Sequence, residues 1–228
     1  MSYGENYGEE IANEGLRINA IKLNTENPFT WASGFRMPIY NDNRMFLSDS
    51  SFRFFIGKGL SSLIAAEKIR FQVIAGTSTA GIPHATTLAN MYEKPLIYIR
   101  DKPKDHGLRN QIEGIDSESD LEGKSVILIE DLISTGGSSV KAVQAIRDAN
   151  GKCNYCFSIF NYGFDSANQV FYDLDSECKV NSLLTYDMLL EVAKEIGYID
   201  EAQVKMLEEW REDPFGWGEK HGFPRVKE

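Results

Sequence analysis

Short, uninterrupted apolar runs constrain the fold of this chain more than any other feature of its sequence. The clearest runs lie at residues 73–75, 96–99, 126–129 and 156–160, with a weaker one at 182–184. Each of the first three is followed by polar or glycine residues. Continuous apolar strands that alternate with helices are typical of a parallel sheet covered on both faces. In such sheets the loops after the strands meet at one edge, where α/β proteins bind ligands. We therefore expect the loops after Ala75, Ile99 and Ile129 to be neighbours in space.

Helical periodicity predicts the elements between these strands. Val140, Val143, Ile146 and Ala149 recur at helical spacing, and the Asn-Gly pair at 150–151 provides a left-handed stop. Ser138 or Ser139 is expected to cap the start of this helix. Other helices are expected over residues 9–23, 51–69, 187–196 and 201–210, with Gly197 ending the third of these.

Bulk composition limits the class of protein. A chain of 228 residues that is 42% apolar can bury one substantial core. The net charge of −10 disfavours nucleic-acid and anionic-membrane partners. No apolar run approaches the roughly 20 residues of a membrane span, and the acidic N-terminus lacks the apolar segment of a secretory signal. Three cysteines cannot all pair, which favours a cytoplasmic location.

Cys153 and Cys156 form a C-x-x-C pattern within the predicted strand KCNYCFSIF. Residues three apart on a regular strand point to opposite faces, so the two sulfurs are not expected to converge on a metal. No second Cys/His pair follows at zinc spacing. We expect buried thiols.

The stretch VILIEDLISTGGSS, residues 126–139, combines an apolar strand, two acids and a run of small residues. Backbone N–H groups before a helix, together with the helix dipole, favour a phosphate group. Two carboxylates directly upstream suit the hydroxyls at the other end of the same ligand. A ribose 5-phosphate has this arrangement, with its 2- and 3-hydroxyls facing Glu130 and Asp131.

Other nucleotide-binding motifs do not match this stretch. A Walker loop requires a lysine after its second glycine, and a dinucleotide fingerprint requires G-x-G-x-x-G. The remaining alternative is a glycine-rich turn before a capped helix, with its acids merely solvated.

A second segment, YIRDKPKDHGLRNQIEG at residues 98–114, concentrates positive charge in an acidic chain. Pro103, Gly107 and Gly114 argue against a regular helix, so a long loop is expected. Taken alone, the segment is as consistent with a solvated charged loop as with a site. Beside a ribose-phosphate site, its cations are suited to stabilise a departing diphosphate.

Residues 126–139 resemble the phosphoribosyl-pyrophosphate motif of the type I phosphoribosyltransferases. Arg100, Lys104, His106 and Gly107 match the R-x-x-x-K-x-H-G loop of the orotate phosphoribosyltransferases. Residues 29–44 and 75–89 are similar to further segments of that family, and the similarity covers most of residues 10–200. The resemblance implies an α/β fold with a mainly parallel central sheet flanked by helices, a small N-terminal hood and a C-terminal helical appendage. It also implies Mg²⁺ as cofactor and a homodimer in which the 100–114 loop acts in trans.

This resemblance assigns roles to individual residues. Catalysis is expected from Lys104, His106 and Asp131. Binding of phosphoribosyl pyrophosphate is expected from Arg100, Lys104, His106, Glu130, Asp131, Leu132, Ile133, Ser134, Thr135, Gly136, Gly137 and Ser138. Orotate is expected to contact Ser134 and Tyr40. No protein residue is expected to ligate the metal directly, because the substrate holds Mg²⁺.

The same resemblance predicts one phosphoribosyltransferase domain over residues 1–210. Its hood covers roughly 10–48, its core roughly 50–185 and its closing helices 186–210; residues 211–228 form a tail.

Three positions depart from the family pattern. Ala32 stands where some branches carry a lysine that contacts the substrate, and Asn161 where some carry an arginine that binds the base. Asp101 replaces a lysine or arginine often found beside Arg100. The predicted activity is transfer of a phosphoribosyl group to orotate, in pyrimidine biosynthesis. A phosphoribosyltransferase for another base and a non-enzymatic sensor of phosphoribosyl pyrophosphate are the alternatives.

Overall fold

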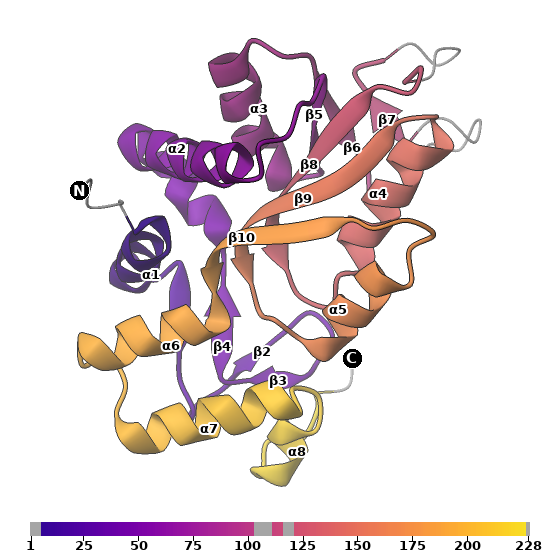
Figure 1. The fold of residues 1–228 in the computed structure, drawn as a ribbon. Helices are drawn as coiled ribbons and strands as arrows, with labels where there is room; N and C mark the ends of the chain where they lie inside the picture. The colour runs from indigo at the N-terminus through magenta and orange to yellow at the C-terminus, as the bar shows by residue number, and fades with distance from the viewer. Residues whose placement is uncertain (1–5, 103–110, 116–120, 227–228) are drawn as a thin grey trace. The chain divides into compact units, whose positions relative to one another are not determined.

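The computed structural model describes residues 6–102, 111–115 and 121–226 (Figure 1). Residues 47–183 form one compact unit, and residues 1–46 together with 184–228 form another. The expected core over residues 50–185 falls mainly in the first of these, which we call the sheet unit. The expected hood and closing helices fall mainly in the second, which we call the terminal unit.

The sheet unit contains a six-stranded sheet in the order β10-β9-β8-β5-β6-β7. Its strands are β5 (Val73–Thr77), β6 (Leu96–Ile99), β7 (Ile112–Glu113), β8 (Ser125–Ile133), β9 (Lys152–Asn161) and β10 (Lys179–Thr185). The pairs β5–β6, β5–β8 and β8–β9 are parallel, and β6–β7 is antiparallel. The predicted parallel α/β sheet is therefore confirmed.

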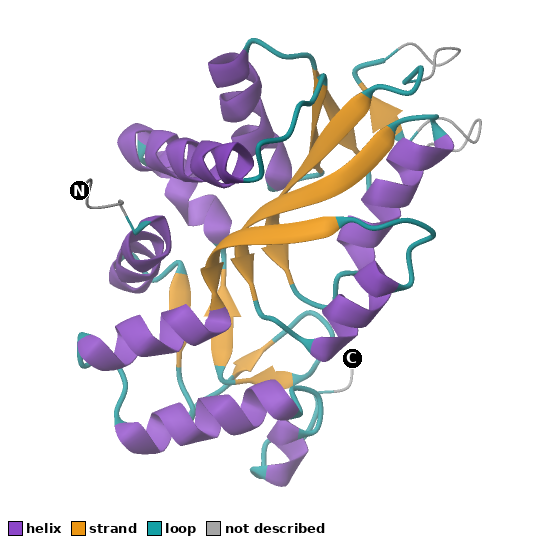
Figure 2. Cartoon of the chain, in the orientation of Figure 1, coloured by secondary structure: helices purple, strands orange, loops and turns teal. Residues whose placement is uncertain are grey.

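Helices cover both faces of this sheet (Figures 1 and 2). Helices α2 (Ser50–Ala66) and α3 (Gly81–Tyr92) lie on one face, and α4 (Gly137–Asp148) and α5 (Asp165–Tyr172) lie on the other. The α4 face buries a cluster that includes Val126, Leu128, Val143 and Ile146. Apolar strands buried on both sides are the reason that the runs in the sequence are continuous rather than alternating.

The terminal unit combines elements from both ends of the chain. It contains helices α1 (Tyr7–Arg17), α6 (Tyr186–Glu195), α7 (Glu201–Glu212) and α8 (Trp217–Lys220), and strands β1 (Ile21–Leu23), β2 (Phe29–Thr30), β3 (Arg36–Met37) and β4 (Ile39–Asn41). Strand β1 pairs with β4, and β2 pairs with β3, both antiparallel. Helix α1 packs against α6. A 3₁₀ helix, η1 (Asn43–Ser48), spans the boundary between the units.

Residues after 210, which the sequence left without a role, contribute to the core of the terminal unit. Trp217 is 1% exposed, and its Nε1 donates a hydrogen bond to the carbonyl of Met206 at 3.1 Å. Trp210 is fully buried against the rings of Trp31 and Tyr186. The C-terminal segment is therefore packed within this unit at least as far as Trp217.

Several predicted boundaries were wrong, including the end of the helix expected over residues 51–69, which stops at Ala66. The helix expected over residues 9–23 ends at Arg17, because Asn19 is left-handed (φ 60°) and residues 21–23 pair with β4 instead. The strand expected at 126–129 continues to Ile133, since pairing with β9 extends through Glu130. Helix α4 begins at Gly137 after a left-handed Gly136, so neither Ser138 nor Ser139 is its cap.

The inference that Cys153 and Cys156 face opposite sides was also wrong. Val126 pairs with Cys153, but Ile127 pairs with Tyr155 and Leu128 with Cys156, so one extra residue is inserted in β9. This β-bulge returns both cysteines to the face covered by α4, where Cys178 joins the same buried cluster. Both sulfurs are buried and free, as expected of structural thiols.

Replacing Trp217 by alanine should destabilise the protein by about 3–5 kcal/mol, because it empties a fully buried aromatic site. Tyr172→Ala is the control, since Tyr172 is 84% exposed and its loss should cost less than about 0.5 kcal/mol. The measurement is the free energy of unfolding in denaturant for each variant. Equal changes in the two variants would show that the C-terminal segment is not packed as described.

Candidate active site

A cavity of about 460 Å³ lies in the sheet unit at the carboxyl ends of β5, β6 and β8. It is lined by Thr77, Ser78, Thr79, Ile99, Arg100, Asp101, Gln111, Glu130, Asp131, Leu132, Ser138, Lys141 and Ala142. Three segments that are distant in the sequence thus meet around one space. The prediction that the loops after β5, β6 and β8 are neighbours is confirmed.

Glu130 is at the centre of the hydrogen bonds in this site, although it is only 5% exposed. Its Oε1 accepts from Thr77 Oγ1 at 2.6 Å and from the backbone N–H of Asp131 at 3.0 Å. Its Oε2 accepts from Ser139 Oγ at 3.0 Å. One carboxylate therefore connects the end of β5, its own strand β8 and the first turn of α4.

Burial, followed by the charge of the adjacent Asp131, raises the pKa of Glu130 to about 8. The hydroxyls of Thr77 and Ser139 act in the opposite direction, because they donate to the carboxylate form. With its pKa at about 8, Glu130 holds a proton at neutral pH and can itself donate a hydrogen bond.

Asp131 differs from Glu130 in its exposure to the cavity. It is half-buried and lines the cavity beside Leu132, one position further along β8. The two acids line the same cavity and interact through their side chains, although they differ in burial. The structure thus gives the site one buried carboxylate and one accessible carboxylate.

The turn into α4 is shaped by Gly136. Its φ is +79°, and a Cβ there would lie 2.8 Å from Val170 Cγ2 and 3.2 Å from Ala167 Cα. A Cβ on Gly137 would meet nothing within 4 Å. Only Gly136 is therefore required by backbone conformation and packing, and its turn directs the first amides of α4 out of the sheet edge.

The predicted site residues fall into four groups. Arg100, Glu130, Asp131, Leu132 and Ser138 line the cavity. Ser134, Thr135, Gly136 and Gly137 form the adjoining turn without lining it, and Ile133 is 1% exposed within the core. Lys104 and His106 lie outside the described residues. Tyr40 belongs to the terminal unit, where its ring packs against Phe29 and Lys22.

Several residues in or beside the cavity had not been singled out from the sequence. Thr77 and Ser139 bind Glu130, and Gln111 donates from Nε2 to the carbonyl of Arg100 at 2.9 Å. Lys141 lines the cavity from α4. Thr77 lies at the end of an apolar run, so the sequence could have indicated that it reaches the same sheet edge. The contact between Ser139 and Glu130 forms only in the tertiary structure and has no sequence signal.

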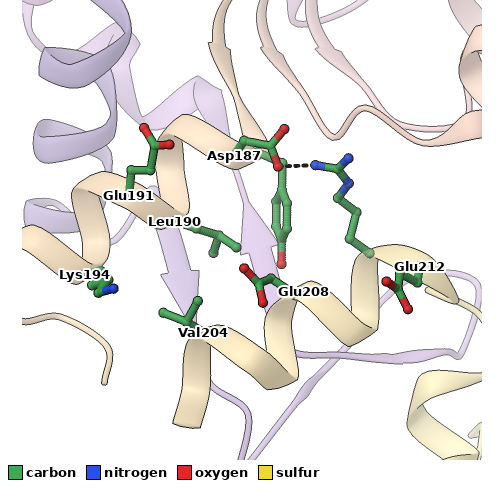
Figure 3. Close-up of a pocket in the computed structure, with 9 residues that line it drawn as sticks. Asp187, Leu190, Glu191, Lys194, Val204, Glu208 and Glu212 are labelled. Atoms are coloured by element: carbon green, nitrogen blue, oxygen red, sulfur yellow. Dashed lines mark hydrogen bonds and ion pairs between the residues drawn. The ribbon is translucent and has the colours of Figure 1, made fainter. Parts of the chain in front are cut away.

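A second cavity, of about 530 Å³, lies in the terminal unit between α6 and α7 (Figure 3). Asp187 pairs there with Arg211, and Lys194 pairs with Glu201. Glu191, Glu208 and Glu212 add further negative charge to its lining. This surplus of carboxylates makes the cavity unsuited to a phosphate ligand.

Two features of the described residues bear on other classes of function. Among them, no group of three or more His, Cys, Asp or Glu side chains is arranged to hold a metal ion. None of the helices in the described part of the chain is long and apolar enough to cross a membrane.

Several known proteins similar to this chain belong to one family. Residues 53–176 match the family model described as phosphoribosyl transferase domain. The chain is 43% identical to an orotate phosphoribosyltransferase of Lactiplantibacillus plantarum, covering 91% of this chain and 95% of that protein. It is 41% identical to one of Cytophaga hutchinsonii, covering 93% and 99%.

A solved structure has the same fold. The crystal structure of an orotate phosphoribosyltransferase from Aeropyrum pernix matches with a TM-score of 0.68. The match covers 83% of this chain and 99% of that one, at 24% identity. The expected type I phosphoribosyltransferase fold is therefore confirmed.

The raised pKa of Glu130 predicts a pH dependence of stability. Between pH about 4.5 and about 8 the folded state holds a proton that the unfolded state has lost, so stability falls as pH rises through this range. Glu130→Gln has no proton to lose at this position, so this part of the fall should be absent. The free energy of unfolding, measured across that range, should therefore favour the variant increasingly as pH rises.

The control is Asp175→Asn, which changes an exposed carboxyl in the same unit. Its difference from the wild type should be nearly constant across the same pH range. A constant difference for Glu130→Gln as well would contradict the assignment of a raised pKa to Glu130.

Proposed function

We propose that this chain, which belongs to the orotate phosphoribosyltransferase family, transfers the 5-phosphoribosyl group of phosphoribosyl pyrophosphate to orotate. The products are orotidine 5-phosphate and diphosphate, and the reaction serves pyrimidine biosynthesis. The observation that carries this proposal is the cavity at the end of β8, with carboxylates on one side and the start of α4 on the other. A sugar phosphate has matching groups at its two ends.

The turn at residues 134–138 is the proposed position of the 5-phosphate. The amides at the start of α4 donate toward that position, and the helix dipole adds positive potential. The hydroxyls of Ser134, Thr135 and Ser138 are further donors. Ile133 contributes backbone only in this proposal, since it is buried in the core, whereas Leu132 lines the cavity.

Asp131 is the proposed partner of the ribose hydroxyls and of the positive charge that develops on the ring. Attack by N1 of orotate at C1 of the ribose inverts that carbon and releases diphosphate. Asp131 lines the cavity, so its carboxylate can oppose the ring charge in the transition state. Glu130 is the proposed second partner of a ribose hydroxyl, and its hydrogen bonds keep the surrounding segments in register.

Mg²⁺ is the proposed cofactor. In this setting Mg²⁺ is held by one or two carboxylates, waters and substrate phosphates rather than by a protein cage. Asp131 and Glu130 lie at the same cavity, and in this proposal neither is a direct ligand of the metal. Bound magnesium would neutralise charge on the diphosphate, while the substrate supplies most of its ligands.

The roles of the basic segment at residues 98–114 are proposed from the sequence alone, because Lys104 and His106 lie outside the described residues. Lys104 is assigned to the departing diphosphate, with His106 and Arg100 beside it. Arg100 is described, and it pairs with Glu113 at 3.3 Å while lining the cavity. In a homodimer this segment would serve the partner's cavity. Exclusion of water from the ring cation is the expected benefit.

Orotate recognition and location are further parts of the proposal. Ser134 and Tyr40 remain the proposed contacts to the base. Asn161 uses its Oδ1 to accept the backbone N–H of Gly163 at 2.8 Å, so its carbonyl oxygen is engaged in a local turn. A cytoplasmic location fits the three free thiols.

The direct test is a spectrophotometric assay of orotate consumption with phosphoribosyl pyrophosphate and Mg²⁺. Adenine, hypoxanthine and uracil run in parallel. We expect turnover of orotate alone, and a loss on the order of 10²–10³ in kcat for Asp131→Asn because a charge opposing the transition state is removed. Asp175→Asn should match the wild type. Turnover of a purine without orotate would overturn the substrate, and binding without any turnover would indicate a sensor.

Mixing two inactive variants tests the dimer with its loop acting in trans. Lys104→Ala and Asp131→Asn should each lose orotate turnover. If Lys104 serves the partner's cavity, a mixed dimer contains one site with both native residues, so an equal mixture should recover about a quarter of wild-type activity. The mixture is assayed after subunit exchange, with each variant mixed with itself as control. No recovery, in samples shown by mass to contain mixed dimers, would contradict the trans arrangement.

A further inference from the structure

The cavity that receives the sugar phosphate has an unusual balance of described charges. Glu130, Asp131 and Asp101 contribute carboxyl groups, and Arg100 and Lys141 contribute cations. Arg100 is paired with Glu113. Among the described residues Lys141 has no ion pair or hydrogen bond, so it is the cavity cation available for a ligand phosphate.

From general helix geometry we expect the Lys141 side chain to extend toward the turn at residues 134–138. Lys141 lies three residues after Ser138 on α4, so the two side chains share one face of the helix. Side chains of an α-helix lean toward its N-terminus, which here is the end at Gly137. The exposed stem of Lys141 is four carbons long and flexible enough to reach past that first turn.

Chemistry favours the 5-phosphate over the diphosphate as the partner of this ammonium. The start of α4 already provides amide donors for a phosphate, but none of the described cavity residues near that turn supplies a full positive charge except Lys141. A phosphate monoester carries close to two negative charges at neutral pH. The diphosphate is assigned to the basic segment that begins at Arg100, at the end of β6.

We propose that Lys141 binds the 5-phosphate of phosphoribosyl pyrophosphate and so contributes to affinity for the sugar donor. This inference rests on the proposed function, because it deepens the same site. Lys141 acts on the non-reacting end of the substrate, so its contribution appears in binding of the donor rather than in turnover of the bound complex.

The experiment compares Lys141→Gln with the wild type in steady-state assays and in direct binding. The KM for phosphoribosyl pyrophosphate should rise about tenfold, the size expected for loss of one exposed charge-assisted contact. The KM for orotate and kcat should stay within about twofold. Calorimetric titration with ribose 5-phosphate should show the same loss of affinity, whereas titration with pyrophosphate and Mg²⁺ should not change. Lys141→Arg should restore most of the affinity.

Lys152→Gln is the matched control, because it removes an exposed lysine at the start of β9, the opposite end of the sheet. It should leave every parameter unchanged. An unchanged affinity of Lys141→Gln for ribose 5-phosphate would overturn the proposal. Equal losses of affinity for ribose 5-phosphate and pyrophosphate would also overturn it, because they would show that Lys141 attracts any anion at the cavity. Binding of ribose 5-phosphate does not depend on orotate. If the proposed reaction were wrong, the wild type would show no turnover of orotate, and this result would not depend on the binding result for Lys141→Gln.

Discussion

The buried carboxylate of Glu130 is the constraint on which the rest of the site depends. A charge or polar group removed from water must be hydrogen-bonded, and Glu130 meets this requirement with donors from β5, β8 and α4. These donors fix where the turn after β5 and the start of α4 lie relative to the tip of β8. Asp131 is then presented to the cavity by a strand whose neighbours are already fixed.

The sequence predicts the parts of this site that depend on interactions between residues close together in the chain. Apolar runs predicted the strands, and the rule that parallel strands end at one edge predicted that three loops would meet. Prediction failed where pairing or packing at a distance decided the outcome. The strand through Glu130 and Ile133 is extended by β9, although the local sequence favours a turn. Ser139 was expected as a cap, yet its hydroxyl is directed to Glu130 because Gly136 takes the capping position.

The same limit explains the errors outside the site. Residues 21–23 have an apolar pattern compatible with a helix, but pairing with β4 makes them a strand. The bulge in β9 places Cys153 and Cys156 on one face, and no periodicity argument detects a single inserted residue. The burial of Trp217 depends on contacts with α7 that follow from the tertiary fold. Roles assigned to Lys104, His106 and Tyr40 come from family resemblance.

The terminal unit is built from two segments that are far apart in the sequence, which has a consequence for folding during translation. Its first 46 residues are made early, but the segment that completes the unit starts at residue 184. Translation at roughly 5–20 residues per second separates these events by roughly 7–28 seconds. The sheet unit is one continuous segment of the chain, so it can fold during that interval. The apolar side chains of residues 1–46 stay exposed until residues 184–228 have been synthesised.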